Sequence, residues 1–88
     1  MLVPDERAVR IGGQPVELRA KEFDLLLALA ARPLVVLTRE TLLETVWGRE
    51  YEIDTRTVDV HVAHLRDRLA GSSLCINTVR GVGYKMTR

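Results

Sequence analysis

The hydrophobic positions between residues 55 and 69 follow the period of an amphipathic helix. At about 100° per residue, four apolar side chains fall on a single stripe that we expect to be buried: Val58, Val62, Leu65 and Leu69. The opposite face carries small, polar and basic groups: Arg56, Val60, Ala63, His64 and Asp67. An exposed valine at position 60 gains nothing from contact with water, but it can make an apolar contact with the methyl group of thymine in the major groove of DNA. The pattern therefore favours a helix that contacts DNA bases.

The segment after this helix predicts a β-hairpin. Strand-like residues 76–79 and 84–87 flank the turn Arg80-Gly81-Val82-Gly83, which places a cation at the tip. We interpret the two glycines as serving backbone geometry, because no helix follows that would receive the phosphates of a dinucleotide. Alone, Arg80 would be a solvated hairpin cation. Beside the preceding helix, we predict that it contacts DNA.

The chain begins with strand-like residues. Residues 9–11 and 16–18 alternate in polarity across the turn signal Gly12-Gly13-Gln14-Pro15, which predicts a hairpin. Residues 2–3 predict another short strand before a turn at residues 4–6. We therefore expect a small antiparallel sheet at the N-terminus.

Two helices are predicted between this sheet and the third helix. Residues 20–31 carry apolar side chains on more than one face, so we expect this helix to lie between two layers, ending before Pro33. Thr38 has the chemistry of an N-cap for the second helix, and Gly48 that of its end. The apolar positions of the second helix are Leu42, Leu43, Val46 and Trp47. Its spacing is amphipathic, so we expect one face to be buried.

The order of elements is therefore strands, three helices and a hairpin. Either Asp54 or Thr55 is suited to cap the third helix. Two helices joined through a turn, with an exposed basic face on the second and a β-hairpin after it, make a winged helix-turn-helix. We predict an α+β fold with an N-terminal antiparallel sheet, three helices and a C-terminal β-hairpin wing, in a single domain of residues 1–88.

The charge of the chain is unevenly distributed. The net charge is only +1, which is low for a nucleic-acid binder. Residues 1–53 hold 7 basic and 9 acidic side chains, however, whereas residues 54–88 hold 6 basic and 3 acidic ones. The cations thus gather around the predicted third helix and hairpin. The single cysteine, Cys75, cannot form an internal disulfide, which fits a reducing cytoplasm, and no stretch approaches the length of a membrane span.

Four segments resemble a known family, the C-terminal DNA-binding effector domains of OmpR/PhoB-type response regulators in bacterial two-component systems. The segments are L-R-A-K-E-F-D-L-L (18–26), L-T-R-E-T-L-L-E-T-V-W-G (37–48), D-T-R-T-V-D-V-H-V-A-H-L-R (54–66) and I-N-T-V-R-G-V-G-Y (76–84). The resemblance covers nearly the whole chain. It implies sequence-specific binding to double-stranded DNA in transcription regulation, without a cofactor, in the cytoplasm and in association with the nucleoid.

The resemblance also implies roles for individual residues. The third helix enters the major groove, and Arg80 of the wing reaches the neighbouring minor groove. Base contacts fall on Val60 and His64, and contacts to the DNA backbone fall on Trp47, Arg56, His61, Arg66, Thr78 and Tyr84. Relatives bind direct repeats as tandem dimers, which implies that the isolated domain is monomeric. Some relatives contact RNA polymerase through the loop that corresponds to residues 47–54.

The chain departs from the family pattern at several positions. Relatives usually have Thr where Arg19 stands, so the first helix lacks its side-chain cap, and Gly is common near Leu34. The pair Ala63-His64 stands where relatives often carry two basic residues, and His64 cannot grip guanine in two places. We therefore expect a different target sequence and a lower affinity. The receiver domain is absent from this chain, which indicates an excised effector domain or an unusual stand-alone one.

Other interpretations of the same residues carry less weight. His61 and His64 are neighbours on the helix, but Asp67 would supply one carboxylate at most, and zinc requires three or four protein ligands. We expect no metal site, and we expect His61 to be a neutral donor to phosphate. Asp59 either pairs with Arg56, orients another arginine or is a solvated acid. No nucleophile has a base placed beside it, so we predict that the protein is not an enzyme.

A protein-interaction module is the rival function. In that interpretation the winged helix docks on RNA polymerase or on a sister domain, and the low net charge and the pair Ala63-His64 favour it. Salt separates the two hypotheses, because DNA binding weakens steeply as ionic strength rises and an apolar protein contact does not.

Overall fold

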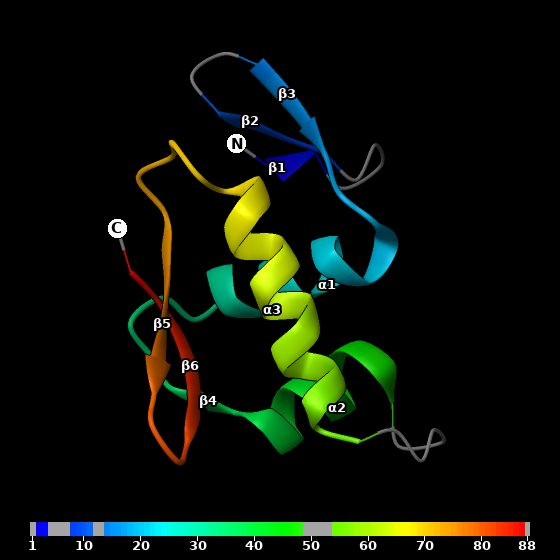
Figure 1. Cartoon of the computed structure of the whole chain (residues 1–88), viewed down its shortest axis with the longest axis vertical. Coiled ribbons are helices and arrows are strands. Elements are labelled where there is room, and N and C mark those ends of the chain that lie inside the picture. Colours follow the sequence, from blue (N-terminus) through cyan, green and yellow to red (C-terminus); the bar gives the residue numbers. More distant parts are fainter. Residues whose placement is uncertain (1, 4–7, 12–13, 49–53, 88) are drawn as a thin grey trace.

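The structure is a computed structural model that describes residues 2–3, 8–11, 14–48 and 54–87 (Figure 1). Its helices are α1 (Ala20–Ala30), α2 (Arg39–Trp47) and α3 (Arg56–Arg68). Its strands are β1 (Leu2–Val3), β2 (Ala8–Ile11), β3 (Gln14–Glu17), β4 (Leu37–Thr38), β5 (Cys75–Val79) and β6 (Gly83–Thr87). The predicted order of strands, three helices and a hairpin is confirmed.

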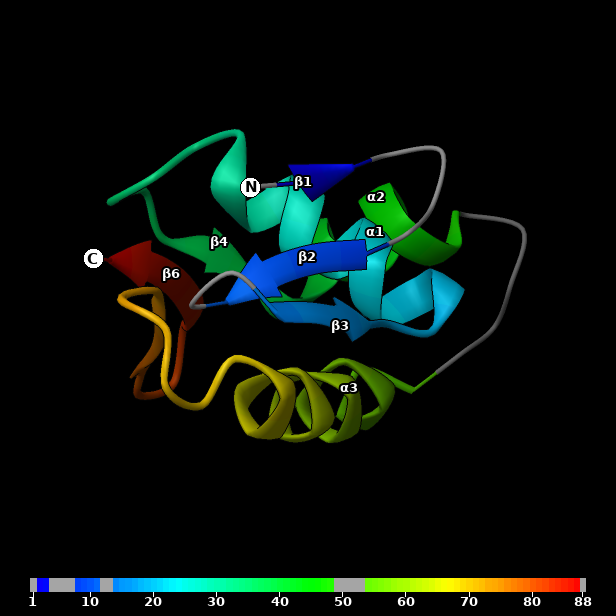
Figure 2. The same ribbon diagram turned by 90° about the horizontal axis from the view of Figure 1, so that it is seen from above.

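The strands form two antiparallel sheets at different places on the helical layer (Figures 1 and 2). The first has the order β1-β2-β3, and the second has the order β4-β6-β5, in which β5 and β6 are the wing. Residues Gln14 and Pro15, predicted to lie in a turn, belong to β3, because Ile11 pairs directly with Gln14. Strand β4 was not predicted, since two residues are too few to show a strand period.

Three predicted connections lie outside the described residues. These are the turn at residues 4–6, the glycine pair at 12–13 and the middle of the loop at 49–53. The structural account below rests on the remaining residues.

Helix α1 lies between layers, as its all-round apolar character predicts. Its residues Phe23, Leu25, Leu26 and Leu29 are all buried, and α1 packs against α2, α3 and β6. Lys21 joins α1 to α2, because its Nζ donates a hydrogen bond of 2.9 Å to the carbonyl oxygen of Val46. A cation at the carboxyl end of α2 satisfies an otherwise unpaired carbonyl group there.

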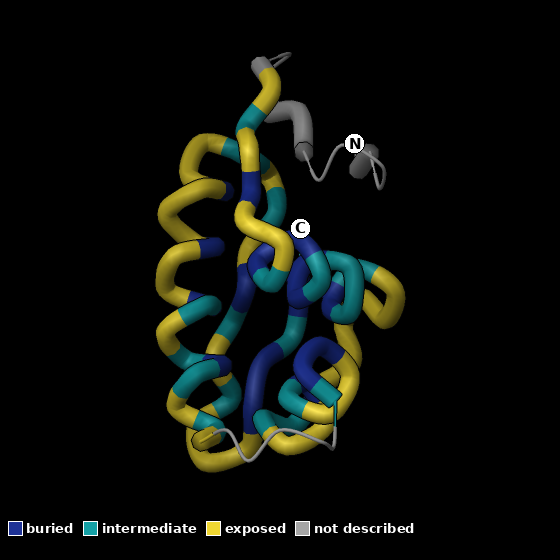
Figure 3. Tube along the Cα trace, turned by 90° about the vertical axis from the view of Figure 1, so that its right-hand side faces the viewer, coloured by how far each residue is buried: buried dark blue, intermediate teal, exposed yellow. Residues whose placement is uncertain are grey.

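The buried stripe predicted for α3 is confirmed. Val58, Val62, Leu65 and Leu69 have between 0% and 4% of their surface exposed. In Figure 3 the inner side of this helix is dark blue and its outer side is yellow or teal along its length. Burial of one side therefore presents the other side to solvent, which is the geometry that a recognition helix requires.

Side chains near the helix starts explain where α2 and α3 begin. Thr38 Oγ1 accepts a hydrogen bond of 3.0 Å from the Thr41 amide, which confirms the predicted N-cap of α2. At α3 the cap is Asp54, whose Oδ1 accepts the Arg56 amide at 2.9 Å, whereas Thr55 makes no side-chain cap bond. The Thr38 cap thus stabilises the start of α2, and the Asp54 cap stabilises the start of α3.

Two backbone positions hold the wing against the helices. Leu34 has a φ of 68°, a left-handed conformation that is rare outside glycine, and its amide donates to the Met86 carbonyl at 2.9 Å. At Gly83, a Cβ atom would lie 2.0 Å from the Leu37 carbonyl oxygen. Glycine is therefore required where β6 approaches β4, and Leu34 carries strain where glycine would not.

Candidate nucleic-acid interface

The outward face of α3 carries the predicted base-contacting residues. Val60 has 52% of its surface exposed, and Arg56, Ala63 and His64 are exposed as well. The stripe of buried residues on the other side fixes this orientation, because a rotation of the helix would expose the core. An isolated, exposed valine among polar groups remains available for an apolar contact.

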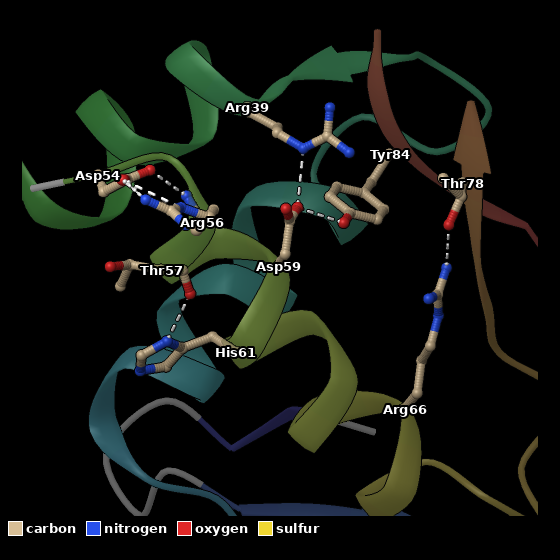
Figure 4. A network of polar contacts seen from close by, with 9 residues as sticks. All are labelled: Arg39, Asp54, Arg56, Thr57, Asp59, His61, Arg66, Thr78 and Tyr84. Atoms are coloured by element: carbon tan, nitrogen blue, oxygen red, sulfur yellow. Dashed lines mark hydrogen bonds and ion pairs between the residues drawn. The ribbon is translucent and has the colours of Figure 1, made fainter. Parts of the chain in front are cut away.

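Arg56 is held at the start of α3 by Asp54 (Figure 4). Its Nη2 and Nε atoms lie 2.9 Å and 3.1 Å from Asp54 Oδ2. The side-chain hydrogen bond from Arg56 lowers the pKa of the Asp54 carboxyl below its ordinary value. The pairing of Arg56 with Asp59, which was one of three alternatives for that acid, is therefore not formed, because the guanidinium bonds Asp54, two residues before it.

Asp59 instead joins three elements of the structure (Figure 4). Its Oδ1 accepts a hydrogen bond of 2.8 Å from Arg39 Nε of α2 and another from the Tyr84 hydroxyl of β6. Partial burial acts to raise the pKa of Asp59, but the hydrogen bonds from Tyr84 and Arg39 outweigh it and lower the pKa overall. This acid orients another arginine, which was one of the three predicted alternatives.

Arg39 was missed by the sequence interpretation. It stands in the first turn of α2, where the helix dipole disfavours a cation. That unfavourable charge was a signal that Arg39 has a partner elsewhere.

Tyr84 is the second donor to Asp59. Burial raises the pKa of the Tyr84 phenol, and the hydrogen bond to Asp59 raises it further, so the hydroxyl is a donor at neutral pH.

Arg66 of α3 forms hydrogen bonds to strand β5 of the wing. Its Nη2 donates to the Ile76 carbonyl oxygen and to Thr78 Oγ1, both at 2.7 Å, and its Nε donates to Ile76 at 3.0 Å. Its Cζ lies 5.6 Å from the centre of the Tyr84 ring, and Arg39 Cζ lies 5.5 Å from that centre. Two guanidinium groups therefore contact one wing tyrosine, which sets the position of the wing relative to α3.

The protonation of His61 follows from its hydrogen bond. His61 Nδ1 lies 2.8 Å from the carbonyl oxygen of Thr57. A carbonyl oxygen only accepts, so Nδ1 carries the hydrogen, and the neutral ring has a lone pair at Nε2. This contact does not involve DNA, so the donation from His61 to phosphate stays a prediction. The Trp47 ring, 9% exposed, packs edge-on against His61 with centroids 4.9 Å apart.

The turn of the wing carries Arg80. Arg80 is exposed, and within the described part of the chain it has no hydrogen bond or ion pair. In Figure 1 the turn between β5 and β6 lies toward the same end of the molecule as the first turn of α3. The turn that carries Arg80 therefore lies toward the end of the molecule where α3 begins.

The described residues also bear on the other predicted classes of site. Among them, no group of three or more His, Cys, Asp or Glu side chains is placed to hold a metal ion. The His61 and His64 ring centroids lie 6.4 Å apart. None of the helices within the described ranges has the length and apolar character that a membrane span requires.

Comparison with known proteins decides the family. Residues 13–86 match the model of the family described as "Transcriptional regulatory protein, C terminal". The chain belongs to this family. It is a DNA-binding effector domain of the OmpR/PhoB response-regulator type, which functions in transcription regulation, and the predicted resemblance is confirmed.

Individual relatives agree with this family. The effector domain is 49% identical over 80 residues to the heme response regulator HssR of Staphylococcus aureus, a match that covers 89% of this chain and 36% of HssR. The chain thus spans about a third of the length of this relative. The DNA-binding domain of Bacillus subtilis CssR superposes with a TM-score of 0.90 at 35% identity, and the match covers 99% of this chain and 98% of the chain of that domain. The winged-helix fold is therefore confirmed.

Two further solved structures contain DNA. The AdeR DNA-binding domain in complex with an intercistronic region has a TM-score of 0.86 and 29% identity, over 100% of this chain and 93% of that one. The Klebsiella pneumoniae RstA domain in complex with the RstA box has a TM-score of 0.82 and 36% identity, over 98% and 88%. The effector domain thus has the fold in which both of these relatives bind DNA.

Proposed function

We propose that the effector domain binds double-stranded DNA sequence-specifically, with α3 in the major groove and Arg80 of the wing in the adjacent minor groove. The observation that carries this proposal is the exposed face of α3, on which Val60 and His64 project while the opposite side is buried. A single α-helix fits the width of the major groove. The AdeR and RstA complexes support the choice of DNA as the ligand.

The proposed base contacts come from the middle of α3. Val60 offers methyl groups to the methyl group of thymine, and His64 offers a ring nitrogen to a base edge. Arg56, at the start of α3, is 85% exposed at its side chain and makes a further contact at the edge of the groove. Val60 and His64 set the sequence preference, and Arg56 contributes a contact to the DNA backbone.

The proposed backbone contacts surround them. Arg66, Thr78 and His61 supply donors for phosphate oxygens, and Arg66 and Thr78 already contact each other, so they act as one unit. Trp47 and Tyr84 are 9% and 4% exposed, and both contact other interface residues. We therefore assign them a supporting part at the rim, where Trp47 holds His61 and Tyr84 holds Arg39 and Arg66.

The assembly around the domain is also a proposal. Two copies would bind direct repeats side by side, each monomeric before it meets DNA, and the residue 47–54 loop would contact RNA polymerase. Because the chain covers 36% of HssR, the complete regulator would carry a receiver domain whose phosphorylation raises the local concentration of effector domains at the operator. Such a regulator would act in the cytoplasm, at the nucleoid.

Selection from a random duplex library at low salt tests the proposal. Enrichment of a repeated half-site, spaced by about one helical turn, is the expected result. Uniform, salt-sensitive retention without enrichment would contradict sequence-specific recognition. Binding to RNA polymerase or a sister domain without salt-sensitive DNA binding would support the protein-interaction alternative instead.

Arg80→Ala tests the wing separately. The variant should bind the selected duplex about tenfold more weakly, because the substitution removes the cation that we propose contacts the minor groove. Arg32→Ala is the matched control, since Arg32 is also exposed but lies in the turn after α1, and it should bind as the wild type does. Equal affinities for all three proteins would remove the wing from the mechanism.

A further inference from the structure

Arg39 lies between the recognition helix and the wing. Its Nε donates a hydrogen bond of 2.8 Å to Asp59 Oδ1 of α3, and its Cζ lies 5.5 Å from the centre of the Tyr84 ring of β6. Arg39 is the first residue of α2, directly after strand β4. In Figure 1 the first turn of α2 lies between the wing turn and the first turn of α3. One guanidinium group thus contacts both of the elements that we assign to the grooves of DNA.

The bond to Asp59 uses a small part of what this guanidinium group offers. A guanidinium has five N–H donors, and the bond to Asp59 involves the single one on Nε. In Figure 4 this bond leaves from Nε, and both terminal nitrogens of Arg39 lie apart from it. The Arg39 side chain is 28% exposed, so the group is held at one point while part of it remains open to solvent.

The other arginines near the interface are engaged differently. Arg66 lies beside the same tyrosine ring, but its Nη2 and Nε are both bonded to the wing. Arg56 directs Nη2 and Nε at one oxygen of Asp54. Both therefore have a terminal nitrogen bonded within the chain, whereas the bond of Arg39 to Asp59 involves Nε alone.

The position of Arg39 matters because of how the grooves of DNA alternate. One sugar-phosphate strand separates a major groove from the adjacent minor groove, so a domain with α3 in one and Arg80 in the other lies across that strand. A cation between the helix and the wing is placed where these phosphates pass. Arginine suits this place, because its planar fork of N–H donors matches two oxygens of a phosphate.

Asp59 fixes the direction of the Arg39 guanidinium group without occupying its terminal nitrogens. A cation bonded to a carboxylate through Nε can donate to a second anion through Nη1 and Nη2, which gives a chain of charge-assisted hydrogen bonds. The Tyr84 hydroxyl donates to the same oxygen of Asp59 and holds the acid in place. Arg39 is therefore oriented before DNA arrives, which lowers the entropic cost of the contact.

We propose that Arg39 binds a phosphate of the strand that runs between the two grooves, in the orientation set by Asp59. The inference rests on the proposed function, because it requires α3 and the wing to lie in adjacent grooves. It adds a DNA contact from the first turn of α2, at the opposite end of that helix from Trp47. Since the phosphate group is the same at every base pair, this contact strengthens binding without reading the sequence.

Salt dependence measures the contact. Arg39→Met removes the charge and keeps an unbranched side chain, so binding to the selected duplex and to an unrelated duplex should weaken by the same factor, about tenfold at low salt. The plot of log affinity against log salt concentration should become shallower by about 0.9, the value for one phosphate. Arg39→Lys keeps the charge and should keep the slope. Arg32→Met, which removes an exposed cation after α1, should match the wild type.

A modified duplex locates the contact. In the selected duplex, phosphates of the strand between the grooves are replaced one at a time by an uncharged methylphosphonate. One such replacement should weaken binding of the wild type but not of Arg39→Met, because the partner of that phosphate is already absent. A purely structural effect of the substitution would not cancel at a single phosphate. An unchanged salt slope in Arg39→Met, or an equal response of both proteins at every modified phosphate, would overturn the inference.

Two controls separate the outcomes. Arg39→Gln carries no charge but keeps an N–H donor for Asp59, so it should lose the same slope as Arg39→Met with less effect on the fold, which thermal melting of both variants checks. If the wild type selects a half-site and both uncharged variants keep its salt slope, the inference fails and the proposed function stands. If the wild type selects no half-site, the proposed function is wrong and the inference falls with it.

Discussion

Tyr84 of the wing donates its hydroxyl hydrogen to the carboxylate of Asp59 on α3, and the same carboxylate oxygen accepts Arg39 Nε of α2. An acid on a helix that faces DNA would repel phosphate if its charge were free. Here the charge is shared with a guanidinium and a phenol, and the acid fixes the wing and α2 at defined positions on α3. The geometry of the interface therefore depends on a residue that need not touch DNA.

Removal of the Tyr84 hydroxyl tests this connection. Tyr84→Phe keeps the ring between Arg39 and Arg66 but deletes the hydrogen bond to Asp59, so the free energy of unfolding should fall by about 1 kcal/mol. For a domain of this size the melting temperature should fall by about 4–8 °C. Val82→Ala, at an exposed position in the wing turn, should change it much less. Equal melting temperatures for Tyr84→Phe and the wild type would contradict the assigned bond.

Acid should weaken the same contacts. Because the pKa of Asp59 in the folded protein lies below its ordinary value of about 3.9, its contacts stabilise the fold fully above that pH. They are lost as pH falls through the folded pKa. The difference in unfolding free energy between wild type and Asp59→Asn should therefore be constant near neutral pH and shrink below about pH 4. Chemical denaturation across this range measures it, and a constant difference down to pH 2 would refute the assignment.

Leu34 offers a stabilising substitution. Its φ of 68° is unfavourable for a side chain with Cβ, and 71% of its surface is exposed, so little burial is lost on replacement. Leu34→Gly should raise the free energy of unfolding by about 0.5–1 kcal/mol. Val35→Gly, at the neighbouring exposed position, should lower it, since only the entropic cost of glycine applies there. A loss of stability in both variants would show that the Leu34 backbone carries no strain.

Structural features that depend only on residues close together in the sequence were predictable. The rotation of about 100° per residue assigns Val58 and Val62 to the core and Val60 to the surface of α3, because side-chain direction in a helix depends on position alone. Thr38 was identifiable as a cap, and Asp54 as one of two candidates, for a similar reason, since a cap bonds an amide two or three residues away. The order of elements, and with it the winged-helix class, follows from such local signals.

Contacts between distant residues required the folded chain. Asp59 has Arg56 as a candidate partner three residues away, yet it bonds Arg39 and Tyr84, which lie 20 and 25 residues away along the chain. The pairing of Glu22 with His64 and the strand β4 likewise depend on which surfaces meet in space. A local pattern gives the direction of a side chain, but its partner is settled by packing of the helices and sheets around one core, which brings together residues that no sequence spacing connects.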